Sequence, residues 1–292
     1  MAINSGTSYT ANRKPASYYA GKIGFYLLIG LIVLVFTAPF LWLIITSLKT
    51  PDNLFKRNPD LLPIPVTLEN YSGVFQGRNF GQNIINSFLV AAITTLGCLF
   101  IGTLAGYSLG RIKYRGRKFL LGIVLAVSMF PGIAIIGPLY LMFSNLQLIN
   151  KLPVLFIPYI TFNLPLTIWL LAAFFRDLPQ ELEEAAEVDG AHPFGAFYRI
   201  MLPLALPGIM TAAILIFINS WNEFLFARTF MSTEANFTAP VAIASFQGIG
   251  DTNEPWGQIS AGAVILTIPL IVLVLLFQRR IISGLTSGAV KG

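Results

Sequence analysis

The stretch PQELEEAAEVDGAHPFGAFYRIMLP, residues 179–203, is an acidic segment in a chain that is otherwise basic and strongly apolar. The acidic side chains in it or just before it are Asp177, Glu181, Glu183, Glu184, Glu187 and Asp189. Apolar runs precede and follow the segment. The interpretation of the acidic segment therefore depends on whether these apolar runs cross a membrane.

The composition predicts an integral membrane protein. Of the 292 residues, 55% are hydrophobic and 11% are charged, and the mean hydropathy is +0.72. Soluble domains have about 25% charged residues, and this chain has too few polar residues to cover the surface of a soluble protein. Its Lys and Arg residues form short runs between apolar blocks and do not line one polar face, so they do not indicate nucleic-acid binding.

Cysteine and histidine each occur once, as Cys98 and His192. A disulfide framework or a His/Cys metal site within this chain is therefore excluded. Cys98 lies in an apolar run and is interpreted as a small buried hydrophobic residue. No catalytic, cofactor-binding or metal-binding residue is predicted.

Six apolar windows are long enough, at about 20 residues, to cross a hydrocarbon layer about 30 Å thick. Backbone in lipid must satisfy its own hydrogen bonds, and the runs do not alternate as barrel strands do, so helices are predicted. The predicted spans are residues 24–48, 86–109, 119–143, 152–175, 204–226 and 259–278. The fold class is all-α, with a single transmembrane domain over residues 1–292.

The distribution of basic residues predicts the orientation. Thirteen of the 19 Lys and Arg residues lie in or beside residues 1–23, the connection after the second span, residues 177–203 and residues 279–292. Positive charge favours the cytoplasmic side. We therefore expect a multi-pass protein of the inner (plasma) membrane with both termini and the acidic segment in the cytoplasm, and with outer loops at 49–85 and 227–258.

Proline and glycine interrupt the third, fourth and sixth spans, at Pro131, Gly132, Gly137, Pro138, Pro158, Pro165 and Pro269. Each proline removes a backbone donor and permits a kink. A gating role and the ordinary abundance of these residues in membrane helices are both open interpretations. Gly102 and Gly106, four residues apart, favour the close approach of another helix.

The acidic segment has the pattern of a helix-turn-helix. Pro179 suits a first helical turn, the early glutamates favour a helix N-terminus, and Gly190 can adopt a left-handed stop conformation. A second helix is predicted from Pro193, with Phe194, Phe197, Tyr198 and Met201 at helical spacing. From the pattern alone, an ordinary solvated loop and a plug for the groove of a soluble partner both remain open.

The motif in this segment resembles the signature of the integral membrane subunits of ABC importers, which is Glu-Ala-Ala, three residues, Gly, nine residues and Ile-x-Leu-Pro. The matching positions are Glu184, Ala185, Ala186, Gly190, Ile200, Leu202 and Pro203. NSFLVAAITTLGCLFIGTLAGYSLGR, LPLTIWLLAAFFRDLP, INSWNEFLFA and GLTSGAVKG resemble the carbohydrate-importing branch, specifically its six-span, maltose-permease-like second subunit. One departure is His192, because relatives often have a small hydroxyl residue there that caps the second helix.

The resemblance implies that the short cytoplasmic helix is a coupling helix seated on a separate ATPase subunit. The coupling residues that it implies are Glu184, Ala185, Ala186, Asp189, Gly190, Ala191 and Phe194. The chain has no G-x-x-x-x-G-K-[ST] phosphate loop. ATP and Mg²⁺ are therefore expected in the partner ATPase, whose closure would drive alternating access.

A second candidate site is the sequence NSWNEF, residues 219–224. In one interpretation Asn219, Trp221, Asn222 and Glu223 face the translocation pathway, where amides and a carboxylate bond sugar hydroxyls and an indole covers a sugar face. In the other, Trp221 is an interfacial anchor beside a solvated acid.

The remaining expectations concern partners and rival functions. The resemblance implies a heterodimer with a second permease, an extracytoplasmic solute-binding protein, a sugar-like solute and membrane lipid as partners, without nucleic acid. The loop 227–258 is either the contact for the binding protein or an unattached flexible loop. An ion-coupled secondary transporter is the alternative function, and an enzyme is disfavoured because no nucleophile, base or acid pair is evident.

Overall fold

The computed structural model describes residues 16–56, 60–76, 78–246 and 255–287. Within these ranges the chain is built of helices and has no strand, which confirms the all-α prediction. The elements are α1 (Ala16–Ser47), α2 (Pro51–Leu54), α3 (Glu69–Phe75), α4 (Phe80–Arg111), α5 (Arg117–Ser128), α6 (Gly132–Asn145), η1 (Leu152–Leu155), α7 (Phe156–Asp177), α8 (Glu181–Val188), α9 (Pro193–Ala196), η2 (Phe197–Met201), α10 (Leu202–Leu204), α11 (Leu206–Trp221), α12 (Leu225–Phe230), η3 (Glu234–Asn236), α13 (Ala239–Ala244) and α14 (Trp256–Ser287).

Four helical stretches in the described ranges are long and apolar enough to cross a membrane unbroken: Gly21–Ser47, Phe80–Arg111, Leu152–Asp177 and Trp256–Gln278. They correspond to the first, second, fourth and sixth predicted spans. The other two predicted spans are bent helix pairs, so the number of spans is six if each pair counts as one.

The third predicted span, 119–143, is not one straight helix. It consists of α5 and α6, which meet at an angle of 83°. Pro131 lies at the break, as the N-cap of α6, where its missing N–H interrupts the helical hydrogen bonds. In contrast, Pro165 and Pro269 lie inside α7 and α14 without ending them.

The fifth predicted span, 204–226, has different ends in the structure. The helical stretch Pro193–Leu204 runs into α11 with a bend of 69°, and α11 ends at Trp221. The chain turns at residues 222–224 and begins the separate short helix α12. The span is therefore shorter than predicted at its second end, although residues 222–226 are mostly apolar.

The centre of the bundle is the pair α4 and α7, which pack closely because glycines face the contact. A β-carbon added at Gly106 would lie 2.8 Å from Leu171 Cβ, and one at Gly110 would lie 2.5 Å from the carbonyl oxygen of Ala172. Gly102 meets Thr167 in the same way. This confirms the prediction that small residues in this helix admit a close neighbour.

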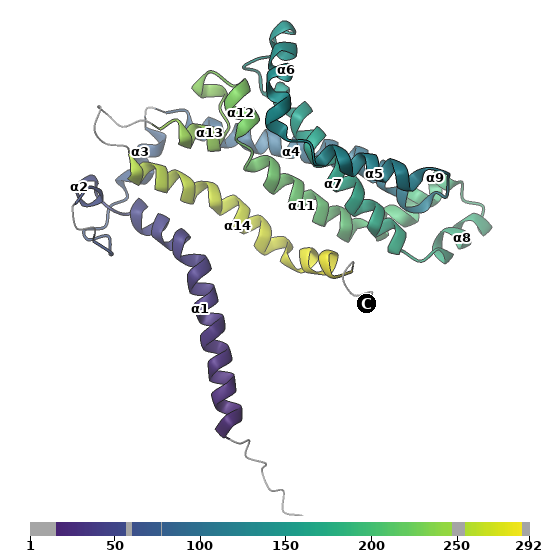
Figure 1. Cartoon of the computed structure of the whole chain (residues 1–292), viewed down its shortest axis with the longest axis horizontal. Coiled ribbons are helices and arrows are strands. Elements are labelled where there is room, and N and C mark those ends of the chain that lie inside the picture. The colour runs from purple at the N-terminus through teal and green to yellow at the C-terminus, as the bar shows by residue number, and fades with distance from the viewer. Residues whose placement is uncertain (1–15, 57–59, 77, 247–254, 288–292) are drawn as a thin grey trace, which may run out of the picture.

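Figure 1 shows α4, α7, α11 and α14 running along the long axis of the molecule. The helix α8 projects at one end, which we call the α8 end, and the C-terminal end of α14 lies toward the same end. The short helices α3, α12 and α13 gather at the opposite end, the α13 end (Figure 1). The helix α1 diverges from the others, and the apolar window of its span has no buried residue.

Candidate functional site

The predicted coupling segment forms a helix and a tight stop. The eight residues of α8 end at Val188, and Gly190 has a φ of +81°, the left-handed conformation that favours glycine. The N–H of Ala191 donates to the carbonyl of Ala186 at 2.9 Å, which closes the helix end. The structure thus has the stop where the sequence predicts it.

The residues of the coupling motif divide between two faces of α8. Ala186 is 4% exposed and packs against the protein. Glu184, Ala185, Asp189 and Gly190 are exposed, and Ala191 is half-buried. Val188 is 87% exposed and Phe194 is 67% exposed, so two large apolar side chains at this segment are accessible to solvent.

His192 caps the second helix, despite its departure from the family pattern. Its Nδ1 atom accepts a hydrogen bond from the N–H of Phe194 at 3.4 Å. The imidazole therefore takes the place of the small hydroxyl side chain, and the doubtful cap is present. The predicted apolar face is divided, because Phe197 and Met201 are buried whereas Phe194 and Tyr198 are exposed.

A buried arginine joins the end of α4 to the start of α8. The Arg111 side chain, 3% exposed, binds Glu183 through Nε at 2.8 Å and Nη2 at 2.6 Å. Its Nη1 and Nη2 also donate to the carbonyls of Leu178 at 2.7 Å and Pro179 at 3.1 Å. Tyr107 donates from its hydroxyl to the other carboxylate oxygen of Glu183 at 2.6 Å. We call this group the Arg111 clamp.

The Arg111 clamp was missed by sequence reasoning. Arg111 is predicted only as one of the basic residues that set orientation, and Glu183 only as an acid at a helix N-terminus. The two residues are 72 positions apart, and their pairing depends on the packing of α4 against α7. A cavity of about 560 Å³ opens beside the clamp; its lining residues are Leu104, Tyr107, Arg111, Ile112, Glu183, His192, Pro193, Phe194 and Phe197.

Of the predicted pathway residues, Asn219 is exposed and lines a surface cavity between α7 and α11. Its amide donates to Asn163 Oδ1 at 2.9 Å, which joins α11 to α7. The Asn163 amide in turn donates to the carbonyl of Tyr159 at 2.8 Å. The pair lines a cavity of about 290 Å³ whose other lining residues are Leu166, Thr167, Leu170, Ala212, Leu215 and Ile216. Paired amides in an otherwise apolar cavity can bind hydroxyl groups.

The other three predicted pathway residues lie elsewhere. Trp221 is 2% exposed and stacks on Phe217 with ring centroids 5.7 Å apart, so its indole is a packed core side chain. Asn222 is exposed and donates to the carbonyl of Ile218 in its own helix. Glu223 accepts from the N–H groups of Phe226 and Ala227 at 2.8 and 3.2 Å, and thereby caps α12. The structure does not bring these side chains together with Asn219.

At the α13 end, side chains of α4 bind the chain between η3 and α13. Asn83 donates to the carbonyls of Glu234 and Phe237 at 2.7 and 3.0 Å. Asn86 donates to the carbonyls of Ala235 and Phe237 at 2.8 and 3.0 Å. Ser87 accepts from the N–H of Ala239 at 2.8 Å. We call Asn83, Asn86 and Ser87 with these main-chain groups the amide latch.

A second set of bonds holds the same segment to the connection between α6 and α7. The side chain of Asn150 accepts from the N–H groups of Ser232 and Thr233 at 3.0 and 3.1 Å, and Asn236 donates to the Asn150 carbonyl at 2.7 Å. Residues 230–236 are therefore held against the body of this chain, whereas the contact of loop 227–258 with the binding protein stays a prediction. Residues 247–254 of that loop, with Gly248 and Gly250, lie outside the described residues.

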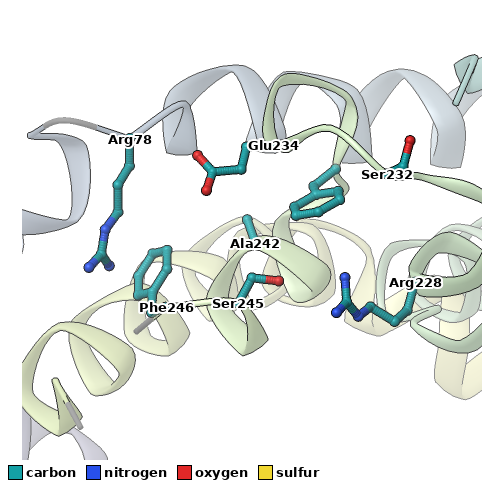
Figure 2. A pocket seen from close by; sticks show the side chains of 8 residues that line it. Arg78, Arg228, Ser232, Glu234, Ala242, Ser245 and Phe246 are labelled. Atoms are coloured by element: carbon teal, nitrogen blue, oxygen red, sulfur yellow. The ribbon is translucent and has the colours of Figure 1, made fainter. Parts of the chain in front are cut away.

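A polar cavity of about 420 Å³ opens at the α13 end. Figure 2 shows Arg78 beside the ring of Phe246 and Glu234 on the same side, with Arg228 across the cavity. The Arg78 guanidinium lies 4.1 Å from the centroid of the Phe246 ring. Burial lowers the pKa of Arg78 from its ordinary value, and the Glu234 carboxylate opposes that shift.

Comparisons with known proteins agree with one another. Residues 99–287 match the family described as binding-protein-dependent transport system inner membrane component. The chain is 47% identical over 254 residues to the trehalose transport system permease protein of Mycobacterium tuberculosis, covering 87% of this chain and 92% of the relative. It is 40% identical over 271 residues to the trehalose/maltose transport system permease protein of Thermococcus litoralis, covering 91% and 96%.

Solved structures show the same fold. A chain of a bacterial ABC transporter involved in the import of the acidic polysaccharide alginate matches with a TM-score of 0.74 and 22% identity, covering 91% of this chain and 98% of that one. A chain of the alginate transporter in complex with an alginate pentasaccharide-bound periplasmic protein matches with a TM-score of 0.67 and 15% identity, covering 90% and 96%. The chain therefore belongs to the family of binding-protein-dependent transport system inner membrane components, the integral membrane permease subunits of ABC importers.

Proposed function

We propose that this permease subunit moves a sugar or sugar-like solute into the cytoplasm. The observation that carries the proposal is the 47% identity, along 87% of the chain, to a permease named for trehalose transport. The 40% identical relative is named for trehalose and maltose. The family argues against the ion-coupled secondary transporter considered as the alternative.

The ATPase partner binds at α8 in this proposal. Support comes from the exposed side of the helix, where Glu184, Ala185 and Val188 are open to solvent. Ala186, on the opposite side of α8, is buried where the helix packs against the rest of its own chain. ATP and Mg²⁺ bind to the ATPase, and its closure moves α8 as a rigid body, which opens the pathway to each side in turn.

The α8 end is cytoplasmic in the same proposal. The basic connection after α4 and the end of α14 both lie toward the α8 end (Figure 1), and basic residues favour the cytoplasmic side. The α13 end then faces the extracytoplasmic solute-binding protein. A solved structural relative is in complex with a periplasmic protein, and residues 227–246 offer a folded surface at this end.

A second permease covers α1 in the assembled transporter. The apolar window of the first span has no buried residue, so the described part of the chain leaves its surface to lipid or to another subunit. Two permease subunits would enclose a pathway between them. We place the Asn163–Asn219 pair on that pathway, where its amides meet the hydroxyl groups of the solute.

The docking part of the proposal is tested by crosslinking from α8. A Val188→Cys variant, assembled with the second permease and the ATPase subunits, is expected to crosslink to the ATPase, because Val188 is the most exposed side chain next to the motif. A Phe36→Cys variant is the matched control, since Phe36 is 80% exposed and belongs to α1, the helix that diverges from the others in Figure 1. Crosslinking from position 36 alone would contradict the docking site.

The substrate class is tested by uptake of radiolabelled trehalose into cells that contain or lack this subunit. Competition by maltose, a polyol and an amino acid then defines the class. Uptake that depends on the subunit and is inhibited by sugars supports the proposal. Inhibition by the amino acid only would contradict it.

A further inference from the structure

The helix α4 binds a short helical segment at each of its ends. The Arg111 clamp holds the start of α8 at one end, and the amide latch holds residues 234–239 at the other. Asn83 and Arg111 are 28 residues apart in one helix, which corresponds to about 42 Å at 1.5 Å per residue. We propose that α4 is a rigid strut that transmits the movement of α8 to the α13 end, with Arg111 as the positioning residue that joins the strut to α8.

The connection from α7 to α8 explains why a clamp is needed. The helix α7 ends at Asp177, and Leu178 has an extended backbone with φ −71° and ψ 143°. Three residues, 178–180, thus separate the two helices, and rotation there would let α8 pivot relative to α7. Arg111 binds the carbonyls of Leu178 and Pro179 as well as the Glu183 carboxylate, so one side chain fixes both the connection and the first turn of α8.

The chemistry of this contact is specific to arginine. Nε, Nη1 and Nη2 all donate, and the planar guanidinium directs them to a carboxylate and two carbonyls at once. Lysine has one ammonium group and cannot reproduce that fork. Tyr107, one helical turn before Arg111, holds the second oxygen of Glu183 and so fixes the carboxylate from the same face of α4.

The strut itself is rigid by two criteria. No proline lies inside α4, whereas α1, α6, α7 and α14 each contain at least one. Its glycines pack against α7 so closely that added β-carbons at Gly102, Gly106 and Gly110 would approach neighbouring atoms within 2.8 Å. A displacement at the Arg111 clamp therefore moves α4 together with α7 and is not absorbed by bending.

The amide latch converts that movement into a change at the α13 end. Five hydrogen bonds join Asn83, Asn86 and Ser87 to the main chain of residues 234–239. Glu234 and Phe237, whose carbonyls accept three of them, also line the polar cavity of Figure 2. Ser245 lines the same cavity and is half-buried, so the reactivity of a cysteine at this position would report the shape of the cavity.

The experiment measures labelling at this cavity in the complete transporter. The proposal rests on the proposed docking of the ATPase at α8. Ser245→Cys is introduced alone and with Arg111→Ala, Arg111→Lys, Glu183→Gln or Lys113→Ala, and each chain is assembled with its permease and ATPase partners in lipid. The rate of reaction with a membrane-impermeant maleimide is measured on this chain, without nucleotide and with a non-hydrolysable ATP analogue and Mg²⁺. Lys113 is the matched control because it is a nearby exposed cation outside the clamp.

We expect the nucleotide to change the labelling rate about fivefold in the parent and in the Lys113→Ala variant, at the lower limit of typical couplings between sites. In Arg111→Ala and Glu183→Gln the change falls below about twofold, and Arg111→Lys is intermediate. If Arg111→Ala does not assemble, Glu183→Gln decides the result, since it removes the charge and preserves the volume.

The proposal that α4 is a rigid strut would be overturned by an unchanged nucleotide effect on labelling in Arg111→Ala or Glu183→Gln. It would also be overturned if the nucleotide had no effect on labelling in the parent. The Val188→Cys crosslink separates this outcome from failure of the proposed function. A crosslink to the ATPase with a normal response in the clamp variants refutes the strut alone. Absence of the crosslink in the parent refutes the docking site itself.

Discussion

The two ends of α4 hold their short helices in different ways. At the α8 end one charged group, Arg111, reaches a carboxylate and two carbonyls, and the outer face of α8 remains uncovered. At the α13 end three neutral side chains bind main-chain groups spread over residues 234–239. Attachment of its first turn by Arg111 and Tyr107 fixes the position of a helix that is already regular. Several attachments are needed where the segment is irregular and its carbonyls need partners.

The largest expected effect comes from removing the amide latch. In the double variant Asn83→Leu and Asn86→Leu, three main-chain carbonyls lose four hydrogen bonds, at about 1–3 kcal/mol for each buried group left unsatisfied. We expect rapid hydrogen exchange in residues 231–246, measured by mass spectrometry, with exchange in α8 unchanged. Asn222→Ala is the control, because this exposed amide bonds only its own helix. An equal loss of protection in residues 231–246 and in α8 would contradict the expectation that the latch holds only the α13 end.

The second effect tests the link between the two ends. Gly110→Ala places a β-carbon 2.5 Å from the Ala172 carbonyl oxygen, and overpacking of this kind costs about 1–3 kcal/mol. We expect a lower unfolding temperature for the purified complex in detergent. Gly137→Ala, in α6, is the matched control, since an added β-carbon there meets no atom within 4 Å. A similar loss in both variants would show that close packing of α4 on α7 is not the cause.

A smaller effect is confined to the α8 end. Gly190→Ala forces a residue with a β-carbon into the left-handed region, at about 1 kcal/mol, although space is available around it. We expect reduced uptake per ATP hydrolysed, with the subunit still inserted. Gly190→Asn should retain more uptake than Gly190→Ala, because asparagine tolerates this conformation better. Full uptake in Gly190→Ala would remove Gly190 from the coupling assignment.

The smallest effect concerns the cap on the second helix of the segment. His192→Ala removes the acceptor for the Phe194 N–H, and the long bond of 3.4 Å places the cost near 0.5 kcal/mol, at the low end for caps. His192→Ser should restore the loss, since serine is a favoured cap. The measurement is hydrogen exchange at Phe194 and Gly195 in the assembled complex. Identical exchange in the parent and in the alanine variant would show that the imidazole cap contributes nothing.

The sequence predicts features that depend on neighbours along the chain. The length of the apolar windows predicts where the spans lie. The glutamates and Gly190 predict α8 and its left-handed stop. Proline composition indicated interruptions but not the bends of 83° and 69°, because a bend angle is set by packing around the break. The early end of α11 at Trp221 was missed because the apolar residues Phe224, Leu225 and Phe226 follow the polar pair 222–223.

The contacts that hold the candidate sites could not be predicted from one sequence. Arg111 and Glu183 are 72 residues apart, and the latch joins residues about 150 positions apart. Each partner has an ordinary local interpretation: a basic residue for orientation, an acid near a helix start, an asparagine near the end of a span. The packing of α4 on α7 brings Arg111 to Glu183, and the packing of η3 and α13 on α4 brings the latch residues to their partners.

The position of α1 has a consequence for the order in which the chain is completed. The largest interface of α1 within its own chain is with α14, the last helix, and α2 and α3 also contact α14. During synthesis α1 is made before α14, so it enters the membrane without the helix that it packs against in the folded chain. A chain truncated before residue 256 would therefore leave α1 without its largest intramolecular interface.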